Sequence, residues 1–282
     1  INLININNII FKFAFLIYLP FYINLIEHNK CIKLNLNHYF IKYFSKLLLL
    51  LGEYELINDY DKISNTNQYL FGIYPHGLFP IGSLGCLSSN ICIDTINNKM
   101  PILNSNKIIC GIASFCFYVP IIREIFLFLG AVDCSRPTMQ NYINNNKSVC
   151  LFVGGAKEAV HSGNGNTTII IKPRRGFFKL ALLNGITIIP VYTFGNSNIF
   201  EATNWDIFNI FYYFKCITGI WFPRGYFNIK RNKFITVFGK HIEVQKITKE
   251  ECSSEKILEL QNKFDKYKHM DKTVSKKILN II

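Results

Sequence analysis

Apolar residues fall into long runs near the N-terminus and into short runs, separated by turns, further along the chain. Residues 9–26 form an apolar stretch with Lys12 near its start and Pro20 in its middle. A straight bilayer-spanning helix needs about 20 apolar residues, and proline kinks a helix. The stretch therefore suits a short span or a re-entrant hairpin, with a buried core helix as the alternative.

Two other apolar segments are interrupted by polar residues. Residues 39–51 end in five successive leucines and carry Lys42 and Lys46 four positions apart. This pattern suits a helix that lies in the membrane interface with its lysines toward lipid headgroups. Residues 207–222 are rich in aromatic side chains, which fits ordinary core, a membrane interface or an acyl channel.

Short strand-like and helix-like runs alternate between these segments. Strands are predicted over Gln68–Tyr74, Lys107–Gly111, Ser148–Val153, Thr167–Lys172, Thr187–Thr193 and Phe234–Gly239. Helices are predicted over Val119–Leu129, 137–145, Gly176–Asn184 and 255–268. Such alternation indicates an α/β layer structure. We expect one folded domain over residues 53–282, preceded by hydrophobic, membrane-associating segments over residues 1–52.

The composition favours a bilayer as the environment of part of the chain. Half of the residues are hydrophobic and only 17% are charged, whereas about a quarter of a soluble domain is charged. The 31 Lys and Arg residues exceed the 18 Asp and Glu residues and give a net charge of +13. Such charge suits anionic lipid headgroups or a phosphorylated substrate. Since no nucleic-acid-binding motif is present, we predict no nucleic-acid partner.

The tetrapeptide Tyr74-Pro75-His76-Gly77 is the first candidate for chemistry. It follows a predicted strand and precedes a segment of small residues. A histidine at such a corner can project from the backbone. With an ordinary pKa near 6.5, it can accept a hydroxyl proton at neutral pH. The alternative is a structural histidine in a Pro-Gly turn.

Gly154, Gly155 and Glu158 form the second candidate, again directly after a predicted strand. Paired glycines let the backbone approach a ligand, and their N–H groups can stabilise a developing oxyanion. Glu158 can bind or orient a partner group. A plain turn is the alternative interpretation.

The third candidate is a run of cations from Lys172 to Lys179 that includes Arg174 and Arg175. It lies where a predicted strand ends and a predicted helix begins. Because helix N-termini favour anions, a phosphorylated donor such as coenzyme A is a natural ligand. A solvated basic turn is the competing interpretation.

The signatures of several other enzyme classes are absent. The sequence contains no Gly-x-Ser-x-Gly, no His-Glu-x-x-His and no Gly-x-Gly-x-x-Gly, which are typical of serine hydrolases, zinc proteases and dinucleotide-binding enzymes. Its nine cysteines have no zinc-ligand spacing. We predict reduced thiols that face a cytosolic compartment, and no metal site.

The order of these motifs resembles the diacylglycerol acyltransferase type 2 family, which includes monoacylglycerol and wax-alcohol acyltransferases. The resemblance runs from about residue 39 to residue 269. It rests on the blocks Tyr69–Gly77, Pro120–Glu124, Ser135-Arg136, Gly154–Glu158, Arg175–Gly195 and Arg224-Gly225. The block from Arg175 to Gly195 is the most specific of these.

The resemblance implies a glycerolipid-acyltransferase-like mixed sheet flanked by helices, with N-terminal hydrophobic segments as membrane anchors. It implies transfer of a fatty acyl group from acyl-CoA to the hydroxyl of diacylglycerol, which makes triacylglycerol. The expected location is the endoplasmic reticulum membrane, with the active site facing the cytosol, or the lipid-droplet surface. Acyl-CoA is expected as co-substrate, without a cofactor or metal. The alternatives are monoacylglycerol, wax-alcohol or lysophospholipid acylation, or a non-catalytic lipid-binding relative.

The resemblance also assigns roles to individual residues. His76 is expected to be the general base and Glu158 a second catalytic residue that orients a partner. Substrate contacts are expected from Tyr74, Pro75, Gly77, Arg123, Arg136, Gly154, Gly155, Arg174, Arg175, Gly176, Phe177 and Lys179.

Two positions depart from the family pattern. Tyr74 replaces the first motif histidine, and Asn196 replaces an acidic residue that follows the Phe-Gly pair. Tyrosine can donate a proton but hardly accepts one at neutral pH. The first departure is therefore expected to alter rate or substrate preference while His76 keeps the chemistry.

Overall fold

The computed structural model describes residues 50–58, 63–64, 66–77, 80, 82–83, 108–118, 122–128, 131–155, 158, 169–171, 174–198, 200–202, 227–229 and 231–266. The predicted apolar segments at 9–26 and 207–222 lie outside these residues, as does 39–51 apart from its last two positions. Within the described part of the chain, no helix is long and apolar enough to cross a bilayer.

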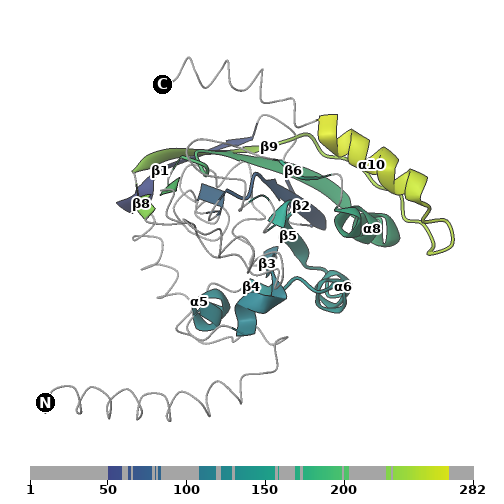
Figure 1. Ribbon diagram of the computed structural model, residues 1–282. Helices are drawn as coiled ribbons and strands as arrows, with labels where there is room; N and C mark the ends of the chain where they lie inside the picture. Colours follow the sequence, from purple (N-terminus) through teal and green to yellow (C-terminus); the bar gives the residue numbers. More distant parts are fainter. Residues whose placement is uncertain are drawn as a thin grey trace, which may run out of the picture.

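A mixed seven-stranded sheet forms the centre of the described part (Figure 1). Its strands, in spatial order, are β1 (Gly52–Asn58), β9 (Asn232–Phe238), β6 (Thr187–Phe194), β2 (Tyr69–Tyr74), β5 (Ser148–Phe152), β3 (Ile108–Ile112) and β4 (Ala131–Asp133). β6, β2, β5, β3 and β4 run parallel to one another. β9 is antiparallel to β6, and β1 is parallel to β9.

The remaining elements are helices and a small ribbon. The helices are η3 (Ser114–Tyr118, a 3₁₀ helix), α5 (Ile122–Phe128), α6 (Arg136–Asn144), α8 (Arg175–Asn184) and α10 (Ser254–Lys266). β7 (Phe200–Ala202) and β8 (Phe227–Ile229) pair as an antiparallel ribbon. The predicted α/β class, with a mixed sheet flanked by helices, is confirmed.

One predicted strand is wrong. Thr167–Lys172 was expected to be extended and paired, but the described residues 169–171 belong to no strand. The N–H of Ile170 donates instead to the side-chain carboxylate of Glu158, at 2.7 Å. An apolar run whose backbone hydrogen bonds go to a side chain looks like a strand in sequence, because periodicity does not show the partner.

Both faces of β2 are buried, which gives the sheet two apolar layers. Leu70 and Tyr74 point to the layer that α6, α8 and α10 cover. Phe71 and Ile73, which alternate with them, point to the opposite layer. Burial on both faces is typical of a central parallel strand. β2 therefore gives a rigid base to the loop that follows it.

Ring packing between α8, α10 and β2 dominates the first layer. Phe264 of α10 is fully buried, and its ring centroid lies 5.3 Å from that of Tyr74, 5.9 Å from that of Phe177 and 5.5 Å from that of Phe178. Gly72 leaves room for these rings, because a Cβ there would lie 2.8 Å from Phe264 Cζ and 2.9 Å from Phe177 Cζ.

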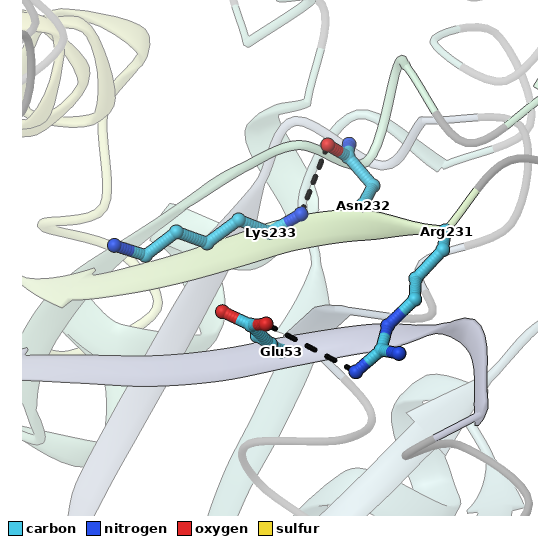
Figure 2. A network of polar contacts seen from close by, with 4 residues as sticks. All are labelled: Glu53, Arg231, Asn232 and Lys233. Atoms are coloured by element: carbon cyan, nitrogen blue, oxygen red, sulfur yellow. Dashed lines mark hydrogen bonds and ion pairs between the residues drawn. The ribbon is translucent and has the colours of Figure 1, made fainter. Parts of the chain in front are cut away.

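The outer strand β1 is joined to β9 by a parallel ladder and by two ion pairs, of which Figure 2 shows the one between Glu53 and Arg231. Arg231 Nη2 lies 3.9 Å from Glu53 Oε1, and Lys233 Nζ lies 3.2 Å from Glu55 Oε2. Exposed pairs of this kind stabilise a fold by about 0–1 kcal/mol each. The backbone ladder is therefore the main attachment of this strand.

We expect the Phe264→Ala substitution to lower the free energy of unfolding by about 3–5 kcal/mol, because it leaves a cavity among the rings of Tyr74, Phe177 and Phe178. Denaturant unfolding of the full chain measures this change. Leu258→Ala on the same helix is the control: Leu258 is 53% exposed, so we expect a change within about 0.5 kcal/mol. Equal effects of the two substitutions would contradict the placement of α10.

Candidate functional site

The candidate residues meet at one edge of the sheet. β2, β5 and β6 are parallel neighbours, so the segments that follow them leave from the same edge. His76 follows β2, Glu158 follows β5 and Asn196 follows β6. In α/β sheets this carboxyl edge is the usual position of a ligand site. The topology thus gathers residues that lie as far as 120 positions apart in the sequence (76 to 196).

The imidazole of His76 has a defined tautomer. Its Nδ1 lies 2.9 Å from the carbonyl oxygen of Gly77. A carbonyl oxygen can only accept, so Nδ1 carries the hydrogen in the neutral ring, and Nε2 has a free lone pair. The ring also packs edge-on against Phe152, with centroids 5.3 Å apart. Nε2 is therefore the atom available to accept a proton.

The surroundings of His76 favour the neutral ring. Burial lowers the pKa of His76 below its ordinary value of 6.5, although the hydrogen bond to Gly77 opposes the shift. Desolvation disfavours the charged imidazolium. At neutral pH the ring is consequently a base that is ready to accept a proton.

Glu158 holds the backbone of His76 rather than its ring. The Glu158 side chain is fully buried. Its Oε2 accepts a hydrogen bond of 2.7 Å from the N–H of His76, and its Oε1 accepts one of 2.7 Å from the N–H of Ile170. Glu158 was expected to be a catalytic group that orients a partner. The two contacts connect its carboxylate to the backbone of the loop on which His76 lies, and a catalytic role of Glu158 stays a prediction.

The glycine pair makes room for this carboxylate. A Cβ on Gly154 would lie 1.7 Å from Glu158 Cδ, so only glycine fits there. Gly155 has a φ of +55°, a conformation that glycine adopts without strain. Arg174 Nη2 donates a short hydrogen bond to the carbonyl oxygen of Gly154. The structure thus brings His76, Glu158, Arg174 and the glycine pair into one constellation.

Other predicted contact residues lie elsewhere. Tyr74 is only 1% exposed, and its ring packs against Tyr192 and Phe264 in the core. Phe177 and Arg123 are also buried. A ligand reaches buried side chains only if the structure rearranges, so their substrate contacts stay predictions.

The exposed members of the predicted substrate set lie at helix starts. Arg175 and Gly176 are exposed at the start of α8, and Lys179 lies partly buried in its second turn. Arg136 is exposed at the first position of α6. Pro75 and Gly77 flank His76 in the chain and are buried, so their substrate contacts also stay predictions. These positions leave Arg136, Arg175 and Lys179 accessible to an anionic ligand.

Comparison with known proteins decides the family. A family model described as diacylglycerol acyltransferase matches residues 9–278. The chain belongs to the diacylglycerol acyltransferase family. The predicted enzyme class, an acyltransferase, is confirmed by this membership.

Individual relatives of this acyltransferase are in line with the family match. Diacylglycerol O-acyltransferase 2 of Dictyostelium discoideum is 31% identical over 82% of this chain and 72% of its own length. Diacylglycerol O-acyltransferase 1 of Eremothecium gossypii is 33% identical over 74% of this chain, but over only 49% of its own length. Among solved structures, the 1-acyl-sn-glycerophosphate acyltransferase PlsC of Thermotoga maritima matches with a TM-score of 0.45 and 12% identity, covering 82% of this chain and 76% of that chain.

Sequence reasoning missed two polar groups next to the loop that carries His76. We call this loop, residues 75–77, the base loop. Asn196 was noted only as a departure from the family pattern, and Ser83 was not singled out. Both are buried, and both hydrogen-bond at the carboxyl edge. A polar residue two positions after a buried strand was the available signal for Asn196. Nothing in the local pattern pointed to Ser83.

We expect Glu158→Gln to lower the free energy of unfolding by about 1–3 kcal/mol. One carboxylate oxygen becomes an NH₂ group, which leaves either the His76 or the Ile170 N–H without its acceptor beside a fully buried side chain. Denaturant unfolding measures the change. Glu259→Gln, at an exposed position of α10, is the matched control: it removes only the surface ion pair with Lys263 and should change the free energy of unfolding much less than Glu158→Gln does, because exposed ion pairs contribute little. Wild-type stability of Glu158→Gln would contradict the two backbone contacts.

Proposed function

We propose that the chain transfers a fatty acyl group from acyl-CoA to the free hydroxyl of diacylglycerol and so forms triacylglycerol. The observation that carries this proposal is the orientation of His76. Its Nδ1–H donates a hydrogen bond to the carbonyl oxygen of Gly77, which leaves Nε2 to accept a proton at the carboxyl edge of the sheet. Family membership supplies the reaction class, and this geometry supplies a base for it.

In the proposed mechanism, His76 Nε2 removes the proton of the acceptor hydroxyl as its oxygen attacks the thioester carbonyl. A tetrahedral oxyanion forms and then collapses, which breaks the carbon–sulfur bond. The imidazolium returns its proton to the departing thiolate of coenzyme A. Backbone N–H groups near Gly77 or at Gly154 and Gly155 stabilise the oxyanion, by roughly 3 kcal/mol for each donor.

The phosphates of coenzyme A are assigned to cations near the base. Arg174 is the first candidate, because its guanidinium donates to the carbonyl oxygen of Gly154, the glycine that also accommodates Glu158. Arg175 and Lys179 lie in the first two turns of α8, and Arg136 lies at the start of α6; all three are further candidates. Arginine suits this task because its planar donors match phosphate oxygens. The proposal needs no metal and no bound cofactor.

The proposal includes attachment to a membrane, because the acceptor is a lipid. The hydrophobic segments over residues 1–52 anchor the chain, and residues 53–282 form the acyltransferase domain. Its location is the endoplasmic reticulum membrane, with the site facing the cytosol, or the surface of a lipid droplet. The apolar composition and the net charge of +13 support this assignment.

Tyr74 bears on the alternative of a non-catalytic lipid-binding protein. The family pattern has a histidine at this position, but the Tyr74 ring lies in the core against Phe264. His76, two residues later, keeps its tautomer and its free Nε2. The substitution at 74 therefore changes core packing and leaves the proposed base in place.

We expect His76→Ala to reduce triacylglycerol formation at least about 100-fold, since general-base catalysis contributes about 10²–10⁴. The assay uses membranes from cells that lack neutral-lipid synthesis, labelled acyl-CoA, and diacylglycerol, monoacylglycerol or fatty alcohol as acceptor. His241→Ala is the control, because His241 packs against Tyr69 at the opposite end of β2. Normal turnover by folded His76→Ala would contradict the mechanism, and lipid binding without product would favour the non-catalytic alternative.

The pH profile gives an independent prediction. Because burial lowers the pKa of His76 below 6.5, the neutral base persists as pH falls through 6.5 and is lost only below that value. We expect kcat/KM to stay level above pH 6.5 and to decline at lower pH. The His241→Ala variant should keep the same profile. An acid limb centred above pH 6.5 would contradict the assignment of His76.

A further inference from the structure

The peptide unit between Pro75 and His76 is held from both of its polar ends. Its N–H donates to Glu158 Oε2 at 2.7 Å. Its carbonyl oxygen, on Pro75, accepts a hydrogen bond of 3.3 Å from Asn196 Nδ2. Glu158 follows β5 and Asn196 follows β6, so the neighbouring strands on either side of β2 each supply one of the two contacts.

The partners of Asn196 determine which way its amide points. Its Oδ1 accepts a hydrogen bond of 2.9 Å from the N–H of Gly82, and its Nδ2 also donates to Ser83 Oγ at 3.3 Å. An N–H can only donate and a carbonyl oxygen can only accept, so the orientation follows from Gly82 and Pro75. Asn196 is 1% exposed. The site therefore uses both the donor and the acceptor of this side chain.

A chain of hydrogen-bonded, buried hydroxyl groups contacts the side-chain amide of Asn196. Ser83 Oγ donates to Thr193 Oγ1 at 2.8 Å, and Thr193 Oγ1 lies 3.0 Å from Thr236 Oγ1. Ser83, Thr193 and Thr236 are all fully buried. Buried hydrogen bonds that are satisfied at every member make a rigid network. The place of Asn196 is thus determined by the interior of the sheet.

The turn that carries Asn196 is held against both β9 and the base loop. Asn232, labelled in Figure 2, donates from Nδ2 to the carbonyl oxygen of Gly195 at 2.9 Å. A Cβ on Gly77, whose φ is +65°, would lie 2.8 Å from Asn196 Cβ. The residue whose carbonyl orients the His76 ring is therefore packed directly on Asn196.

We propose that Asn196 is a positioning residue for His76. Its amide and the Glu158 carboxylate together hold the Pro75–His76 peptide, and this determines where the imidazole Nε2 lies. The inference rests on the proposed function, because it assigns Asn196 to the base of acyl transfer. An acid at this position presents two oxygens when ionised, and one of them would face the Pro75 carbonyl oxygen with no hydrogen between them. The departure from the family pattern thus supplies a donor that an ionised acid lacks.

The test compares Asn196→Asp and Asn196→Ala with wild type in membranes, using the full chain, labelled acyl-CoA and diacylglycerol. We expect kcat to fall by roughly 10- to 100-fold in both variants, since small misplacement of a catalytic group has effects of about that size. KM should stay within about two-fold, because the substrate contacts are not altered. Asn198→Ala is the matched control: Asn198 is exposed in the same turn, and its variant should keep wild-type turnover.

Hydrogen–deuterium exchange of peptides that contain residues 75–77 provides a readout that does not need activity. We expect faster exchange in Asn196→Asp and Asn196→Ala than in wild type and Asn198→Ala. If wild type forms no product, the proposed function fails and the exchange rates alone decide the inference. Unchanged exchange would overturn it.

The kinetic outcomes separate the two claims. Full activity of both Asn196 variants, beside an inactive His76→Ala, would overturn the role of Asn196 and leave the proposed function standing. A raised KM with unchanged kcat would also overturn it, because Asn196 would then act in substrate binding. If Asn196→Ala does not fold, the nearly isosteric Asn196→Asp carries the test.

Discussion

The buried carboxylate of Glu158 joins the two loops on which the site is built. It accepts hydrogen bonds from the backbone of His76 and of Ile170, so one side chain links the segment after β2 to the segment after β5. Gly154 leaves the space that this carboxylate occupies. Without these contacts, two partly buried N–H groups would lack their acceptors, which costs free energy. The position of the imidazole follows from this carboxylate.

The sheet beneath the loops makes that position rigid. β2 lies between β5 and β6 and is buried on both faces. Tyr74, the last residue of the strand, is held between the rings of Tyr192 and Phe264. Because the interior is close-packed, the end of β2 can move little, and this restricts the residues that directly follow the strand. The backbone position of His76, two residues after this strand, is therefore well defined. Burial favours the neutral form of its ring by lowering its pKa.

Local pattern predicted much of the fold, and it placed His76 and the glycine pair shortly after strands, where the structure also has them. It was wrong for Thr167–Lys172, since periodicity cannot show that an N–H bonds to a side chain. It also missed the role of Asn196, whose partners Gly82 and Pro75 lie 114 and 121 positions away. Contacts across such distances depend on strand order, which a single sequence does not show.

A structure of the full chain with diacylglycerol and a non-reactive thioether analogue of acyl-CoA tests the central claim most directly. The account predicts the acceptor hydroxyl roughly 3 Å from His76 Nε2, within hydrogen-bond reach. It also predicts the acyl carbon beside that hydroxyl and the coenzyme A phosphates on the cations around Arg174. An analogue bound with its acyl carbon remote from His76, or with His76 Nε2 bonded to a protein donor, would contradict it.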